Sequence, residues 1–155
     1  MKISEHISYK EATYSQTAIR NDIPNDPNEE QLERIKLAAE KLFEPLREWV
    51  GGPIKINSCF RSELLNKRIG GSKSSQHMAN NGAAFDLDDT YGHKTNSEMF
   101  HYIKDNLDFD QLIWEFGTDK NPNWVHVSYK KENNRKSILK ACKINGKTKY
   151  LKWEE

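Results

Sequence analysis

Two histidines and one aspartate stand in sequence contexts that suit metal chemistry. His77 lies in a polar loop of Ser, Asn and Gly residues, where packing gives no reason for an imidazole. Asp86 follows the small residues at the head of a strand-like segment, and His126 lies in another such segment, WVHVSY. Two imidazoles and one carboxylate, with a fourth position left to water, form the ligand set of a catalytic zinc site. The nine-residue interval from His77 to Asp86 is not a helical metal motif, so spacing alone also leaves structural roles open.

The other histidines and the cysteines have weaker contexts. His6 and His101 lack any partner pattern and are expected to be surface or structural residues. We expect the same of His93, although the acidic residues before it leave a weak accessory metal site open. Cys59 and Cys142 are too few for a disulfide framework. We expect two half-buried thiols in strands.

A long helix is predicted from about residue 26 to residue 50. Asp26, Pro27 and Glu29 resemble a capping box with proline in the first turn. Pro45 is expected to kink the last turns, and Gly51 with Gly52 to end the helix. Apolar residues recur at helical steps and mark the face that packs into the core: Leu32, Ile35, Ala39, Leu42, Leu46 and Trp49.

The rest of the chain alternates strand and helix patterns. Strands are expected within residues 54–60, 83–89, 110–116 and 123–129, a brief helix within 62–70, and a capped helix beginning at Thr95. Asn145-Gly146 between two strand-like runs is a strong hairpin signal. The economical assembly is one α+β domain over residues 1–155, with an antiparallel sheet flanked by helices. Residues 1–25 are expected to form an N-terminal arm or edge element, and residues 130–155 a C-terminal hairpin extension.

Composition narrows the class of protein. The 155 residues include 24 basic and 23 acidic side chains, for a net charge of +1, which gives no broad attraction to nucleic acid or to an anionic membrane. The lysine-rich tail is expected to solvate strand edges rather than bind DNA. No window is apolar enough for a membrane helix. We therefore expect no nucleic-acid or membrane partner. The chain is expected to be a monomer.

Four segments of the chain carry a more specific pattern: SCFRS, GGSKSSQHMANNGAAFDLD, FDQLIWEFG and WVHVSY. Through them, and over roughly residues 14–129, the chain resembles the zinc D-Ala-D-Ala carboxypeptidase family of metallopeptidases and its phage-associated branch. The family pattern is Ser-x-His, a few residues, Gly-x-Ala-x-Asp, and a later His in a strand. Here the matching residues are Ser75, His77, Gly82, Ala84, Asp86 and His126.

The resemblance implies a fold, a cofactor and roles for residues. The fold is the small α+β domain shared with Hedgehog signalling domains and DD-peptidases. One zinc ion is implied on His77, Asp86 and His126, with Arg61 binding a substrate carboxylate or the developing oxyanion. Ser75 is implied to orient His77 or to bind substrate. The substrates are peptidoglycan stem peptides, cut by D,D-carboxypeptidases or by L-alanyl-D-glutamate endopeptidases.

Two departures from the family pattern affect these expectations. The interval between the first two ligands is nine residues rather than seven, and Asn80-Asn81 looks like the added pair, in a loop that can bulge outward. Many relatives place the general base three residues before the last histidine, where this chain has Asn123, and an amide cannot accept that proton. Glu115 is the expected replacement, as in much of the phage-associated branch. Asp119, in the following turn, is the weaker candidate.

Two functions follow as hypotheses. The first is a zinc metallopeptidase that hydrolyses stem peptides, with Glu115 as base. The alternative is a family member that has lost hydrolysis and serves as a zinc-binding phage structural or cell-wall-binding module, an option that Asn123 keeps open. The N-terminus has no apolar signal-peptide region. We therefore expect synthesis in the cytoplasm, with action at the bacterial wall after release or on a phage particle.

Overall fold

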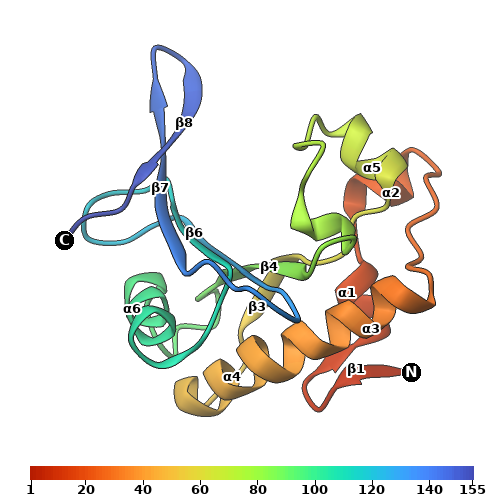
Figure 1. Cartoon of the computed structure of the whole chain (residues 1–155), viewed down its shortest axis with the longest axis horizontal. Coiled ribbons are helices and arrows are strands. Elements are labelled where there is room, and N and C mark those ends of the chain that lie inside the picture. The colour runs from red at the N-terminus through yellow and green to blue at the C-terminus, as the bar shows by residue number, and fades with distance from the viewer.

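A six-stranded mixed sheet organises the chain, with strand order β3-β4-β6-β5-β7-β8. The computed structural model describes residues 1–155. Figure 1 shows the long helix and the helix at 96–106 below this sheet, a lobe with short helices to one side, and a hairpin projecting from the other end. A second, two-stranded sheet lies near the N-terminus. The α+β class with a DD-peptidase-like arrangement is confirmed.

The elements follow one another with short connections. The strands are β1 (Lys2–Ser4), β2 (Ile7–Ser8), β3 (Lys55–Ser58), β4 (Ala83–Asp88), β5 (Gln111–Glu115), β6 (Trp124–Tyr129), β7 (Ser137–Ile144) and β8 (Lys147–Lys152). The helical segments are α1 (Tyr9–Thr13), α2 (Gln16–Arg20), α3 (Glu29–Ala38), the π-helical η1 (Ala39–Phe43), α4 (Glu44–Val50), α5 (Glu63–Arg68), the 3₁₀ turn η2 (Gln76–Met78) and α6 (Asn96–Asn106). None of the helices is both long and apolar enough to cross a membrane.

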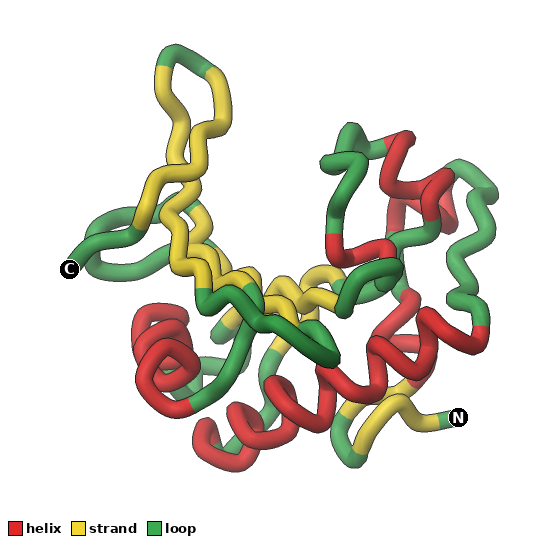
Figure 2. The backbone as a smooth tube through the Cα atoms, viewed as in Figure 1, coloured by secondary structure: helices red, strands yellow, loops and turns green.

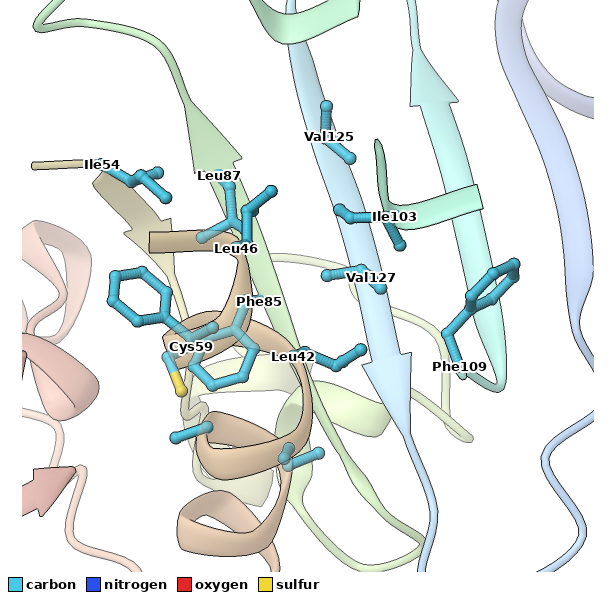
Figure 3. Packing of buried hydrophobic residues seen from close by; sticks show 14 of the residues in the cluster. Leu42, Leu46, Ile54, Cys59, Phe85, Leu87, Ile103, Phe109, Val125 and Val127 are labelled. Carbon is cyan, nitrogen blue, oxygen red and sulfur yellow. The ribbon is translucent and has the colours of Figure 1, made fainter. Parts of the chain in front are cut away.

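The sheet buries one face against helices and turns the other toward a cleft. On β4 and β6, alternate residues such as Phe85 and Val127 point into the core, where they meet Leu42 and Leu46 of the long helix (Figure 3). The residues between them, including Asp86 and His126, lie on the opposite face. The alternation along each strand therefore separates packing from chemistry.

The long helix differs in two respects from the expectation. Its N-cap is Asn28 with Gln31 as the capping-box partner, not Asp26 with Glu29, and Asp26 instead accepts a hydrogen bond from the Tyr9 hydroxyl. The helix is also not one regular α-helix, because a π-helical turn over Ala39–Phe43 joins α3 to α4. This wider turn ends two residues before Pro45. Because Pro45 has no backbone N–H to donate, the regular α-helical hydrogen-bond pattern is interrupted there, and the π-helical turn accommodates the interruption.

Residues 1–25 form β1, β2, α1 and α2 and pack onto the main body. Ile3, Ile7 and Ala12 are buried in the main core cluster. Asn25 joins this segment to the residues after β3, because its side chain donates to the carbonyl of Phe60 and accepts from the backbone N–H of Ser62. The segment thus helps to hold the loop that carries Arg61.

The C-terminal hairpin forms as predicted but is joined to the sheet in an unexpected way. β7 and β8 are antiparallel around the Asn145-Gly146 turn, while β7 pairs with β5 in parallel, so the expectation of an antiparallel sheet is wrong for this pair. Trp153 folds back after β8, and its ring lies 5.1 Å from that of Phe100 between centroids. Figure 2 shows the hairpin rising from the sheet edge, opposite the lobe that contains α5.

Candidate functional site

Pairing of β4 with β6 brings two of the predicted ligands together. Asp86 and His126 are direct cross-strand partners on the cleft face of the sheet. Nδ1 of His126 lies 3.0 Å from Oδ1 of Asp86. The two side chains meet because β4 and β6 pair in continuous register, without a bulge, over residues 83–87 and 125–129.

The third predicted ligand comes from the 3₁₀ turn η2. Ser75 caps this turn by accepting a hydrogen bond from the backbone N–H of His77 at 3.2 Å. Nδ1 of His77 lies 2.7 Å from the carbonyl oxygen of Cys59, and Nε2 lies 3.2 Å from Oδ2 of Asp86. A carbonyl oxygen only accepts, so Nδ1 donates to the carbonyl of Cys59, and Nε2 is the ring nitrogen turned toward Asp86. This is the orientation that a metal-binding imidazole needs.

The three side chains fit a zinc ion. Their ligand atoms all lie within 4.8 Å of one another, and ligands of a tetrahedral zinc site are roughly 3.4 Å apart, given bonds of about 2.0–2.2 Å. Burial acts to raise the pKa of Asp86, but the charges and hydrogen bonds of His77 and His126 hold it well below its ordinary value. The carboxylate is therefore ionised at neutral pH, as a ligand must be.

The loop between His77 and Asp86 contains the Asn80-Asn81 pair, and both candidate ligands at its ends face the same cleft. Ala79 and Gly82 both have left-handed backbone angles, with φ of 56° and 81°, and Asn80 and Asn81 between them are exposed. A side chain at Gly82 would collide with the carbonyl oxygen of Tyr129. The glycine thus allows the loop to pass directly over β6 before β4 begins.

Glu115 lies beside the three candidate ligands on the same face of the sheet. Glu115 on β5 pairs with Trp124 on β6, two residues along β6 from His126 and on the same face, and only 7% of its surface is exposed. Burial, reinforced by the negative charge of Asp86, raises its pKa to about 7, against the opposing influence of His126 and Trp124. The indole N–H of Trp124 has no hydrogen bond of normal geometry. A carboxyl group with a pKa near neutrality suits proton transfer at physiological pH.

Arg61 approaches the same cleft from the loop after β3. One of its terminal nitrogens donates to Ser75 Oγ at 3.2 Å, while its Nε is buried with no hydrogen-bond partner. Burial lowers its pKa, and the nearby Asp86 and Tyr150 oppose that change. A guanidinium that keeps unused donors at a cleft is suited to bind a carboxylate.

These residues line one cleft of about 840 Å³. Its floor is the exposed face of β4, β6 and β5. One wall is the polar segment 70–76 with Arg61, and the opposite wall comes from the C-terminal hairpin. The hairpin residues that line it were not identified from the sequence: Leu139, Thr148 and Tyr150.

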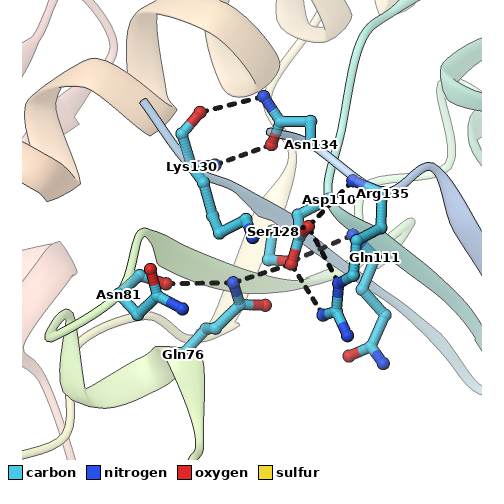
Figure 4. Close-up of polar contacts among 8 residues, drawn as sticks. All are labelled: Gln76, Asn81, Asp110, Gln111, Ser128, Lys130, Asn134 and Arg135. Carbon is cyan, nitrogen blue, oxygen red and sulfur yellow. Dashed lines mark hydrogen bonds and ion pairs between the residues drawn. The ribbon is translucent and has the colours of Figure 1, made fainter. Parts of the chain in front are cut away.

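A buried ionic network closes one end of the cleft (Figure 4). Asp110 is fully buried and accepts two hydrogen bonds from the Arg135 guanidinium, at 3.0 Å and 2.7 Å. Although burial opposes it, the hydrogen bonds from Arg135 and Gln76 lower the pKa of Asp110 to about 2. Gln76 precedes His77, so this contact fixes the η2 turn against β5. No motif in the sequence signals the network.

The remaining candidates lie elsewhere. Asp119 is exposed in the turn after β5 and pairs with Lys140 at 2.6 Å, outside the cleft. His6 pairs with Glu44, and the ring of His101 packs against Phe100. Cys59, expected to be half-buried in a strand, is instead fully buried just beyond β3, where burial raises the pKa of its thiol far above the ordinary value.

Comparison with known families agrees with this geometry. The sequence model described as Peptidase M15 matches residues 5–128, which include the candidate metal ligands, Arg61 and Glu115. The chain belongs to the peptidase M15 family. Members of this family are zinc-dependent peptidases, so family membership implies a peptidase here. A search of curated proteins gave no match. The C-terminal hairpin lies outside the matched region.

Proposed function

We propose that this M15 peptidase is a zinc enzyme that hydrolyses peptide bonds of bacterial peptidoglycan stem peptides. The observation that carries the proposal is the convergence of His77, Asp86 and His126 in one cleft with Glu115, whose pKa is near neutrality. A ligand set of two imidazoles and one carboxylate leaves a position open for reaction. The bond cut is of the D,D-carboxypeptidase or the L-alanyl-D-glutamate endopeptidase type.

Each residue has a distinct part in the proposed reaction. His77, Asp86 and His126 would hold a zinc ion, which would supply the Lewis acidity that polarises the peptide carbonyl and acidifies water. Glu115 accepts a proton from the attacking water as the water oxygen bonds to the carbonyl carbon. When the carbon–nitrogen bond breaks, Glu115 returns that proton to the departing amine. Arg61 binds a carboxylate of the peptide, and Ser75 keeps both the Arg61 fork and the η2 turn in place.

The position of Glu115, together with Asn123, supports placing the chain in the phage-associated branch of the family. The chain has Asn123 where many relatives carry the base, and the Asn123 side chain cannot accept a proton. Its backbone N–H donates to the carbonyl of Glu115 at 2.9 Å, so Asn123 instead helps to close the turn that presents Glu115. This substitution supports the phage-associated branch, with the enzyme reaching the wall after lysis or on a particle.

Incubation with purified peptidoglycan, with and without a chelator, tests the proposal. Mass analysis should show new stem fragments only when zinc is present. Loss of a terminal D-alanine identifies a carboxypeptidase, and release of the stem after its first alanine identifies the endopeptidase. A protein that binds zinc but yields no fragments under either condition would instead be the non-catalytic binding module that Asn123 leaves open.

A further inference from the structure

The C-terminal hairpin extends a row of cross-strand partners that begins at the candidate active site. Trp124 on β6 pairs with Glu115 on β5, and Glu115 pairs with Ala141 on β7. Ala141 in turn pairs with Tyr150 on β8. Directly paired residues point to the same face of a sheet, so Tyr150 belongs to the same face as Glu115. Only the small side chain of Ala141 separates them along the row.

Tyr150 lines the cleft and faces its charged groups. Burial raises the pKa of Tyr150, as do the negative charges of Glu115 and Asp86, while Arg61 opposes the increase. The phenol is therefore protonated at neutral pH and able to donate a hydrogen bond. No protein group accepts a hydrogen bond from it, and 56% of the residue is exposed. Tyr150 thus offers a free donor across the cleft from Arg61.

We propose that Tyr150 is a substrate-binding residue that, together with Arg61, holds a carboxylate of the peptide across the cleft. This inference rests on the proposed function and adds a residue outside the part of the chain that matches the family. Arg61 and Tyr150 line opposite walls of the cleft, and the Tyr150 hydroxyl has no partner, so the guanidinium and the hydroxyl present donors to one anionic group between them. Stem peptides carry free carboxylates that suit such a site.

Substitution Tyr150→Phe isolates the hydroxyl, since it preserves the ring. The test measures hydrolysis of a synthetic stem pentapeptide by the zinc-loaded protein. We expect KM to increase about 10- to 100-fold, the range for a lost hydrogen bond to a charged group, with kcat changed by less than about 3-fold. Tyr91→Phe is the matched control, because Tyr91 is equally exposed at 56% but lies outside the cleft, and it should leave both constants unchanged.

A binding measurement separates this inference from the proposed function. Calorimetric titration of the zinc-loaded protein with the same pentapeptide reports affinity even if the protein hydrolyses nothing. Tyr150→Phe should weaken binding of the free-acid peptide and leave binding of the fully amidated peptide as it is in the wild type. Equal affinity of wild type and Tyr150→Phe for the free-acid peptide, or an equal loss for both peptides, would overturn the assignment.

Discussion

Replacing Glu115 with glutamine tests the electrostatics of the cleft directly. Burial raises the pKa of this carboxyl group from an ordinary 4.5 to about 7, so the folded protein holds its proton more tightly than the unfolded chain does. Below pH 4.5 the group is protonated in both states and burial carries no charge penalty. As the pH rises from about 4.5 to above 7, the unfolded chain ionises first, and the folded state loses stability relative to it.

The magnitude follows from the difference between the two pKa values. About 2.5 pKa units at 1.36 kcal/mol each corresponds to roughly 3 kcal/mol above pH 7. Glutamine has no charge, so Glu115→Gln should become more stable than wild type by up to about this amount as the pH rises from 4 to 8. Urea denaturation of the metal-free proteins across that range measures the difference. A difference that stays constant with pH would refute the burial argument.

The same variant tests catalysis when zinc is present. Glutamine keeps the shape of the side chain but accepts no proton, so turnover of stem peptides should fall about 10²- to 10⁴-fold while zinc stays bound. Asp119→Asn is the matched control and should be nearly silent, because Asp119 is exposed outside the cleft. Normal turnover by Glu115→Gln together with an inactive Asp119→Asn would move the base to the turn.

Two further predictions concern the metal and the core. Metal analysis of the wild-type protein should find about one zinc per chain. His77→Ala and His126→Ala should each lose most of this zinc, whereas His101→Ala should keep it. Full zinc retention in both ligand variants would mean that the site is misassigned. Leu42→Ala should lower the free energy of unfolding, measured by urea denaturation, by about 2–5 kcal/mol, because Leu42 is buried. Leu64 is exposed, so Leu64→Ala should change this free energy by less than about 0.5 kcal/mol. Equal effects of the two substitutions would contradict the assigned core.

Local sequence patterns predicted the main helices and strands. Contacts between residues far apart in the sequence decided where the long helix begins. The stretch DPNEEQ contains two overlapping capping boxes, and only one can begin the helix. Asn28 is used because Gln31 also donates to the carbonyl of Met78 at 3.2 Å, which ties the helix to the loop after His77. Asp26 meanwhile bonds Tyr9. These partners are far apart in sequence, so no local pattern could choose between the boxes.

The residues of the candidate site could also be predicted only in part from the sequence. His77, Asp86 and His126 could be grouped because a motif spans them, and Glu115 because the expected base position holds an amide. Their roles stay predictions, although the structure brings all four together. Tyr150 could not be found in this way, because its place depends on the parallel pairing of β7 with β5. Such pairing joins strands that are not adjacent in the chain and has no turn signal of its own.

The ionic network at Asp110 crosses the end of the region of family similarity. The similarity ends at residue 128, yet the counter-ion of the buried Asp110 is Arg135. A chain cut after residue 128 would bury a carboxylate without this arginine and leave the edge of β5 unpaired, which favours aggregation through that edge. Residues outside the region of family similarity thus supply a counter-ion and a paired strand beside the candidate metal-binding cleft.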